Sequence, residues 1–145
     1  MLVVFPIGLW VFSLVGDIVY LAGGPAAWLA ASYYAIGVGI VGALLAAIPG
    51  MIDLVSMRPG QAKRVGIWHM GLNLAAVVVF AITFYLRTIA VPLDWTPFVI
   101  SLVGVGIIGV SGWLGGEMVY VHGMAVDQAA PSTRLPRSGQ HREAA

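Results

Sequence analysis

Apolar residues along this chain form long blocks, and short segments with proline, glycine and polar residues separate them. Four blocks are about twenty residues or longer, the length that a helix needs to cross a bilayer core of about 30 Å. They cover residues 2–21, 30–55, 66–90 and 97–121. The connections "AGGPAAW", "SMRPGQAKRV" and "VPLDWT" are short. The pattern therefore predicts an all-α membrane protein, an antiparallel up-and-down bundle of four transmembrane helices.

After residue 124 the sequence becomes polar, contains prolines and loses its periodicity. We expect residues 1–124 to form one transmembrane domain and residues 125–145 to form a disordered cytoplasmic tail. The composition agrees, because 60% of the residues are hydrophobic and only 9% are charged. The chain has no cysteine, which excludes disulfides, cysteine-held iron–sulfur clusters and thiol catalysis.

The basic residues predict how the helices are oriented. Arg58, Lys63 and Arg64 lie in the second connection, and the tail carries three further arginines. The first connection has no charged residue, and the third has only Asp94. The positive-inside rule therefore places both termini and the second connection in the cytoplasm. The lipid bilayer is the first expected partner, and no nucleic-acid partner is expected.

One face of each predicted helix is lined by small and polar residues, spaced alternately three and four apart; we call each such face a seam. The seams are Pro6, Trp10, Ser13, Asp17 and Tyr20; Ser32, Ile36, Gly39, Ala43, Ala46, Gly50 and Asp53; His69, Asn73, Ala76, Phe80, Thr83 and Arg87; and Ser101, Gly104, Ile108, Ser111, Gly115, Met118 and His122. Small residues let helix backbones approach closely in lipid. We expect the four seams to face one interior.

Two charged residues lie near the outer ends of their spans. Asp17 ends the first span and Arg87 ends the third, so the two lie at similar depth. An unpaired charge inside a bilayer costs about 3 kcal/mol or more, so each residue needs a partner. The sequence predicts an ion pair between them with a structural role.

A second polar group, Asp53, His69, Asn73 and His122, lies toward the cytoplasmic end of three spans. His69 and His122 belong to antiparallel neighbours at similar depth, so they are candidate axial ligands of haem b, with Asn73 orienting an imidazole. Two alternatives stay open. The histidines can bond to each other, Asp53 or Asn73 and only hold the bundle together. They can also bind a zinc ion with Asp53, or transfer protons.

Four motifs in this order, "VVFPIGLWVFSLVGDIVY", "AAIPGMIDL", "WHMGLN" and "GVSGWLGGEMVYVHGMAV", resemble the bacterial membrane family called domain of unknown function 2231. The resemblance covers residues 2 to about 126 and implies four spans in the bacterial inner membrane. Some family members are fused to a Rieske iron–sulfur domain, which implies an electron-transfer setting and a Rieske-type partner. Members usually carry a His-Pro pair just before the stretch that matches residues 2–6, and this sequence lacks that pair.

The leading expectation is therefore a multi-pass membrane protein in whose sequence no enzymatic site can be demonstrated. No nucleophile–base pair and no acid–base carboxylate pair converges, so no catalytic residue is named. The first alternative is a haem-binding electron-transfer subunit that uses His69 and His122. The second is a structural or assembly subunit of a larger membrane complex. A channel or transporter is disfavoured, because the spans show no inverted repeat of broken helices.

Overall fold

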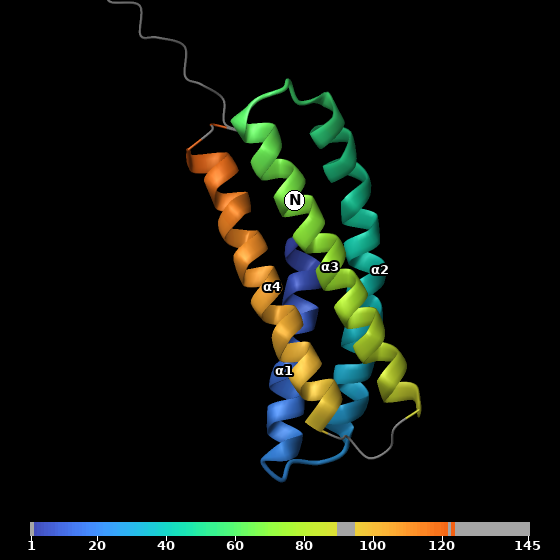
Figure 1. The fold of residues 1–145 in the computed structure, drawn as a ribbon. Coiled ribbons are helices and arrows are strands. Elements are labelled where there is room, and N and C mark those ends of the chain that lie inside the picture. Colours follow the sequence, from blue (N-terminus) through green and yellow to red (C-terminus); the bar gives the residue numbers. More distant parts are fainter. Residues whose placement is uncertain (1, 90–94, 122, 124–145) are drawn as a thin grey trace, which may run out of the picture.

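The structure, a computed structural model, describes residues 2–89, 95–121 and 123. These residues form four α-helices that run up and down side by side (Figure 1). The helices are α1 (Val4–Leu21), α2 (Ala27–Ser56), α3 (Gln61–Ile89) and α4 (Trp95–Tyr120). Each is long and apolar enough to cross a membrane. The predicted four-span, all-α architecture is confirmed, while the expected tail lies outside the described residues.

The helix bounds differ most from the prediction at the second connection. We expected the third span to begin at residue 66, whereas α3 begins at Gln61, because Gln, Ala, Lys and Arg are good helix formers. Lys63 and Arg64 therefore belong to the start of α3, and the connection shortens to residues 57–60. Pro49 lies inside α2, where a transmembrane helix tolerates it.

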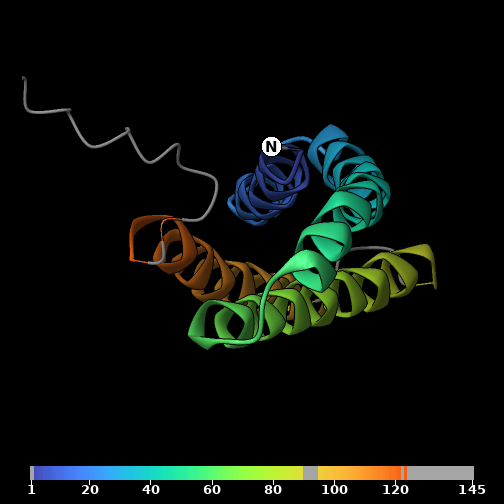
Figure 2. The ribbon, with the colours of Figure 1, turned by 90° about the horizontal axis from the view of Figure 1, so that it is seen from above.

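The helices pack as two hairpins, α1 with α2 and α3 with α4, joined mainly through α2 and α3. The backbones of the diagonal pairs, α1 with α3 and α2 with α4, do not come into contact in the described ranges. Seen from above, the ribbons of α1 and α4 stand apart at the end where α2 and α3 are connected (Figure 2). Figure 1 shows that α1 begins well short of this end.

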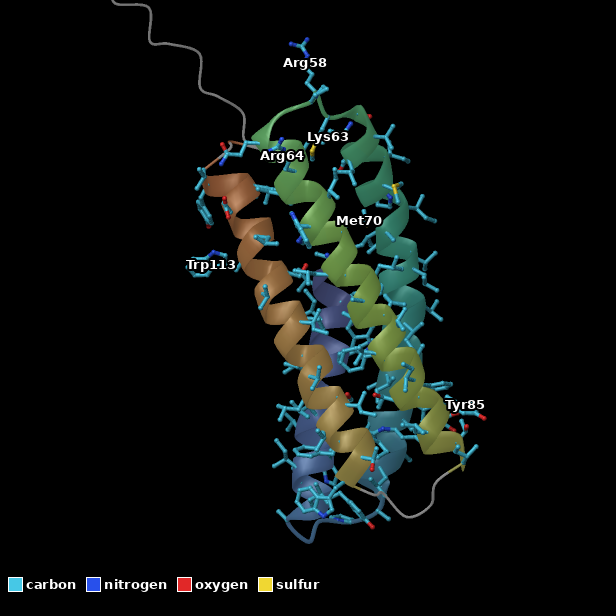
Figure 3. All side chains as sticks on the ribbon, viewed as in Figure 1. Arg58, Lys63, Arg64, Met70, Tyr85 and Trp113 are labelled. Atoms are coloured by element: carbon cyan, nitrogen blue, oxygen red, sulfur yellow. The ribbon has the colours of Figure 1, made fainter. Side chains whose placement is uncertain are left out.

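This arrangement divides the bundle into two parts. The lower half, residues 4–42, 74–89 and 95–110, contains all four helices, whereas the upper half, residues 43–73 and 111–121, contains α2, α3 and α4. The outer surface of both halves is apolar, as lipid contact requires. Trp113 and Tyr85, for example, are 79% and 62% exposed and project outward from the bundle (Figure 3).

The core lies in the lower half. The rings of Trp10 and Phe80 stack with centroids 4.3 Å apart and an interplanar angle of 9°. The indole Nε1 of Trp10 donates a hydrogen bond of 3.3 Å to the carbonyl oxygen of Ile36. Gly104 lets α4 approach Phe80 closely, since an added Cβ would lie 2.7 Å from the edge of the Phe80 ring. One stacked aromatic pair therefore connects all four helices.

The seams predicted from spacing are confirmed in the lower half, where most of their residues are buried. The buried seam residues are Pro6, Trp10, Ser13, Asp17, Ser32, Ile36, Gly39, Ala76, Phe80, Thr83, Ser101, Gly104 and Ile108. In the upper half only Ser111 among the seam residues is buried, and the others are half-buried or exposed. The reason is geometric, because α1 does not cover this part of the bundle.

Candidate functional site

Asp17 of α1 and Arg87 of α3 form the predicted ion pair across the diagonal of the lower half. The Arg87 guanidinium donates through Nη1 to Asp17 Oδ1 at 2.9 Å and through Nη2 to Asp17 Oδ2. The two side chains are only 5% and 0% exposed. The planar guanidinium of Arg87 therefore binds both carboxylate oxygens. This bidentate geometry best offsets the desolvation cost of a buried ion pair.

Buried hydroxyl groups around this pair bond mostly to backbone carbonyls. Ser13 Oγ donates to the Trp10 oxygen at 2.7 Å, and Ser32 Oγ donates to the Ser13 oxygen at 2.8 Å. Among the described residues, two buried side-chain atoms, Arg87 Nε and Ser101 Oγ, have no hydrogen-bond partner. Most of the polar groups of the lower half are thus used to connect or brace helices.

His69 of α3 is the centre of a second polar network, in the upper half. Its Nδ1 lies 2.8 Å from the carbonyl oxygen of Ser111 and 3.0 Å from Ser111 Oγ, both on α4. Its Nε2 lies 3.0 Å from Nδ2 of Asn73, one turn along α3. The Asn73 amide also donates to the His69 carbonyl oxygen at 2.9 Å.

These partners select one form of the imidazole. The Ser111 carbonyl can only accept, so Nδ1 carries the proton, and the Asn73 amide group donates, so Nε2 accepts. The Asn73 orientation is fixed by the same logic, because the reverse orientation would place its oxygen against the His69 carbonyl. The network therefore holds a neutral Nδ1–H imidazole and links α3 to α4.

The described surroundings of His69 do not fit an axial haem ligand. When Nδ1 donates to a carbonyl, Nε2 is the atom left to bind iron, and here Nε2 accepts from Asn73. The ring also packs closely on α4, because a Cβ added at Gly115 would lie 3.2 Å from His69 Cε1. A porphyrin does not fit between α3 and α4 at this point, and ligation needs the Asn73 side chain to move away.

Asp53, another member of the expected polar group, does not join this network. It is exposed near the end of α2 and takes no part in the hydrogen bonds of His69. His122 lies outside the described residues, so its part in a haem or zinc site stays a prediction. Within residues 2–89, 95–121 and 123, no group of three or more His, Asp or Glu residues is placed to hold a metal ion.

Sequence reasoning missed Ser111 as the partner of His69. Ser111 was placed on the α4 seam, but its bond to His69 runs mainly through a backbone carbonyl, which side-chain patterns do not reveal. The signal available was its position one turn before Gly115, whose missing side chain lets the His69 ring reach the α4 backbone.

Methionine side chains, together with Leu54, pack against glycines of α2 and α3 in the upper half. A Cβ added at Gly66 would lie 3.5 Å from the sulfurs of Met57 and Met118, and one added at Gly50 would lie 3.5 Å from Cε of Met70. Several seam residues here stay half-exposed, and we call this set the open seam. It consists of Ala43, Ala46, Gly50, His69, Asn73, Gly115 and Met118.

Comparison with family models identifies a match over residues 1–128, to a family described as a predicted membrane protein, domain of unknown function 2231. The chain belongs to this family. Membership agrees with the four membrane-length helices, so the protein is a multi-pass membrane protein. Comparisons with curated proteins and with solved structures found no match.

Proposed function

We propose that this member of the family is a structural subunit, a small helical bundle that offers the open seam to a partner in a larger membrane complex. The observation that supports this role is how the polar side chains are used. Asp17 bonds to Arg87 through both oxygens, and His69 bonds to Asn73 and Ser111 through both ring nitrogens. These polar groups therefore serve contacts within the bundle. The open seam is the part of the seams that no other helix covers.

The chemistry of the open seam suits a transmembrane helix of a partner. Lipid gives helices no hydrophobic reason to associate, so close packing of small residues and hydrogen bonds drive association. In the lower half, α1 covers the seams of its neighbours. A partner helix laid between α2 and α4 in the upper half would bury Ala46, Gly50 and Gly115 in the same way.

We also place this surface toward the cytoplasm of a bacterial inner membrane, with both termini on that side. The support is the charge distribution, since Arg58, Lys63 and Arg64 all lie at the α2–α3 end. A Rieske-type protein stays one candidate for the partner.

Site-specific photo-cross-linking in native membranes tests the structural role. A photoreactive amino acid replaces Ala46 on the open seam, and a control variant carries it at Leu44, which is 52% exposed on another face of α2. We expect a discrete protein adduct of defined mass from position 46 and only lipid adducts from position 44. Equal adduct patterns at the two positions, or no protein adduct from position 46, would contradict the role.

A haem-binding electron-transfer subunit is the second candidate. The Nδ1 hydrogen bond to the Ser111 carbonyl leaves Nε2 as the ligand atom, so this candidate requires the Asn73 amide to leave Nε2 and the ring to move away from Gly115. Reduced-minus-oxidised absorption spectra of protein purified from haem-supplemented cells test it. A haem spectrum that disappears in the His69→Ala variant would support this candidate, and absence of a Soret band would exclude it.

A further inference from the structure

A cationic cluster lies at the α2–α3 end of the bundle. Arg58 lies in the connection and Lys63 and Arg64 lie at the start of α3, and Figure 3 shows all three at this end. Within the described ranges the only other Lys or Arg residue is Arg87, which Asp17 neutralises. The described acidic residues of the upper half are Asp53, exposed on α2, and Glu117, half-buried on α4. The cluster is thus a positive surface at one end of a membrane protein.

The cluster borders a cleft of about 730 Å³. Its walls are Pro59, Gly60, Gln61, Lys63, Arg64 and Ile67. The cleft lies at the N-terminus of the 29-residue α3, whose first turn contains no acidic residue. Backbone N–H groups and the helix dipole both favour an anion at such a position. The cationic side chains Lys63 and Arg64 add full charges to this partial one.

Lys63 is held in place beside the cleft. Its Nζ donates to the carbonyl oxygen of Met57 at 3.1 Å, which satisfies an acceptor at the end of α2 and restrains the ammonium group. An ammonium has three donors, so two remain for a ligand. Lys63 is half-buried, whereas Arg58 is exposed and does not line the cleft. The site therefore has one restrained cation, Lys63, and one exposed cation, Arg64.

The apolar side of the cleft points to the rest of the ligand. Ile67 lines the cleft and is 54% exposed, and Trp68 beside it is 70% exposed. Exposed tryptophans on membrane helices lie at the level of the lipid headgroups. The cations Lys63 and Arg64 match the phosphate of a phospholipid headgroup. The exposed Ile67 and Trp68, just below them, match its acyl chains.

We propose that this cleft binds one anionic glycerophospholipid, with its phosphate against Lys63 and Arg64 and an acyl chain along Ile67. The net positive charge of the cluster favours an anionic headgroup over a zwitterionic one, whose amine it would repel. This site is independent of the open seam and does not require the partner proposed above.

Lipid titration followed by native mass spectrometry tests the proposal, on full-length protein that has been delipidated in a neutral detergent. Phosphatidylglycerol, phosphatidylcholine and glycerol 3-phosphate are compared as probes. We expect one phosphatidylglycerol per chain at low concentration, several-fold weaker phosphatidylcholine binding, and little glycerol 3-phosphate binding. Equal binding of the two lipids would overturn the charge selectivity, and equal binding of glycerol 3-phosphate would show a free phosphate site instead.

Three charge-neutralising variants make the test specific to the cleft. Lys63→Gln and Arg64→Gln should each weaken phosphatidylglycerol binding about fivefold, the loss expected for one cation at a membrane surface. Arg58→Gln removes the same charge outside the cleft and should weaken binding less than twofold. Lys63→Gln also loses the hydrogen bond to the Met57 carbonyl oxygen and so could unfold. In that case Arg64→Gln alone tests the site. Equal losses in Arg58→Gln and Arg64→Gln would show nonspecific charge attraction and overturn the site.

Discussion

The lower and upper halves of the bundle use similar seams but complete them differently. In the lower half, α1 covers its neighbours, Trp10 stacks on Phe80, and Asp17 pairs with Arg87 across the diagonal. The upper half lacks α1, and its three helices contact one another through Leu54, several methionines and the histidine network. Methionine side chains adapt to irregular gaps, so this packing is softer.

The difference shows how to interpret polar residues in a membrane bundle. Asp17 and His69 both look costly in an apolar span, yet each is bonded to another helix. The two halves differ in whether α1 covers the seams. The seams of the lower half are mostly buried, whereas the open seam is half-exposed. This difference supports the proposal that the lower half stabilises the bundle and that the upper half carries the interaction surface.

Breaking the buried ion pair should produce the largest effect. In Asp17→Asn the Arg87 charge stays buried without a counter-charge, and we expect the free energy of unfolding to fall by about 3–5 kcal/mol. Unfolding by sodium dodecyl sulfate in mixed micelles measures it. The control Asp53→Asn changes an exposed carboxylate and should shift stability by less than about 0.5 kcal/mol. Similar losses in the two variants would contradict the structural role of the pair.

The same substitution at three glycines of α4 compares the halves directly. Gly104→Ala pushes a Cβ to 2.7 Å from the fully buried Phe80 and should cost about 1–3 kcal/mol. Gly115→Ala meets the half-buried His69 at 3.2 Å, so a small shift of the ring should leave stability nearly unchanged.

Gly112 is the control of this series, because nothing lies within 4 Å of its added Cβ. Gly112→Ala should stabilise the protein by up to about 1 kcal/mol through helix propensity. Thermal melting in one detergent orders the three variants. If Gly115→Ala were more damaging than Gly104→Ala, the upper half would be the more rigidly packed part.

Removing one amide from the histidine network should have a smaller effect than breaking the ion pair. Asn73→Ala leaves Nε2 of His69 without its donor, and we expect a loss of about 1 kcal/mol. Ser111→Ala is the matched control, because it keeps the carbonyl that accepts from Nδ1, so it should cost less. The same melting assay measures both, and a larger loss from Ser111→Ala would mean that the hydroxyl, not the carbonyl, fixes the ring.

Much of the fold could be predicted from the sequence, because helical spacing determines which residues face the interior. The third span shows this well, since Ala76, Phe80 and Thr83 are all fully buried as the spacing predicts. The ion pair was also predictable, because a bilayer leaves Asp17 and Arg87 few alternatives at their depth. The family resemblance is confirmed by the match over residues 1–128.

The candidate site was harder to predict for physical reasons. His69 bonds to a backbone carbonyl, and every residue has one, so no pattern singles out Ser111. Asp53 was grouped with His69 by its place on a seam, but α2 extends 30 residues, and its last turns leave the covered part of the bundle. The early start of α3 also moved Lys63 and Arg64 from a loop to a helix N-terminus.

The central claim is that His69 ties α3 to α4 through hydrogen bonds at both of its ring nitrogens. Solid-state ¹⁵N NMR of histidine-labelled protein in lipid bilayers tests it directly, with the His69 signal assigned by its loss in His69→Gln. We predict a single neutral Nδ1–H form whose unprotonated Nε2 accepts a hydrogen bond. A metal-coordinated signal, or a mixture of the two neutral forms, would contradict the claim.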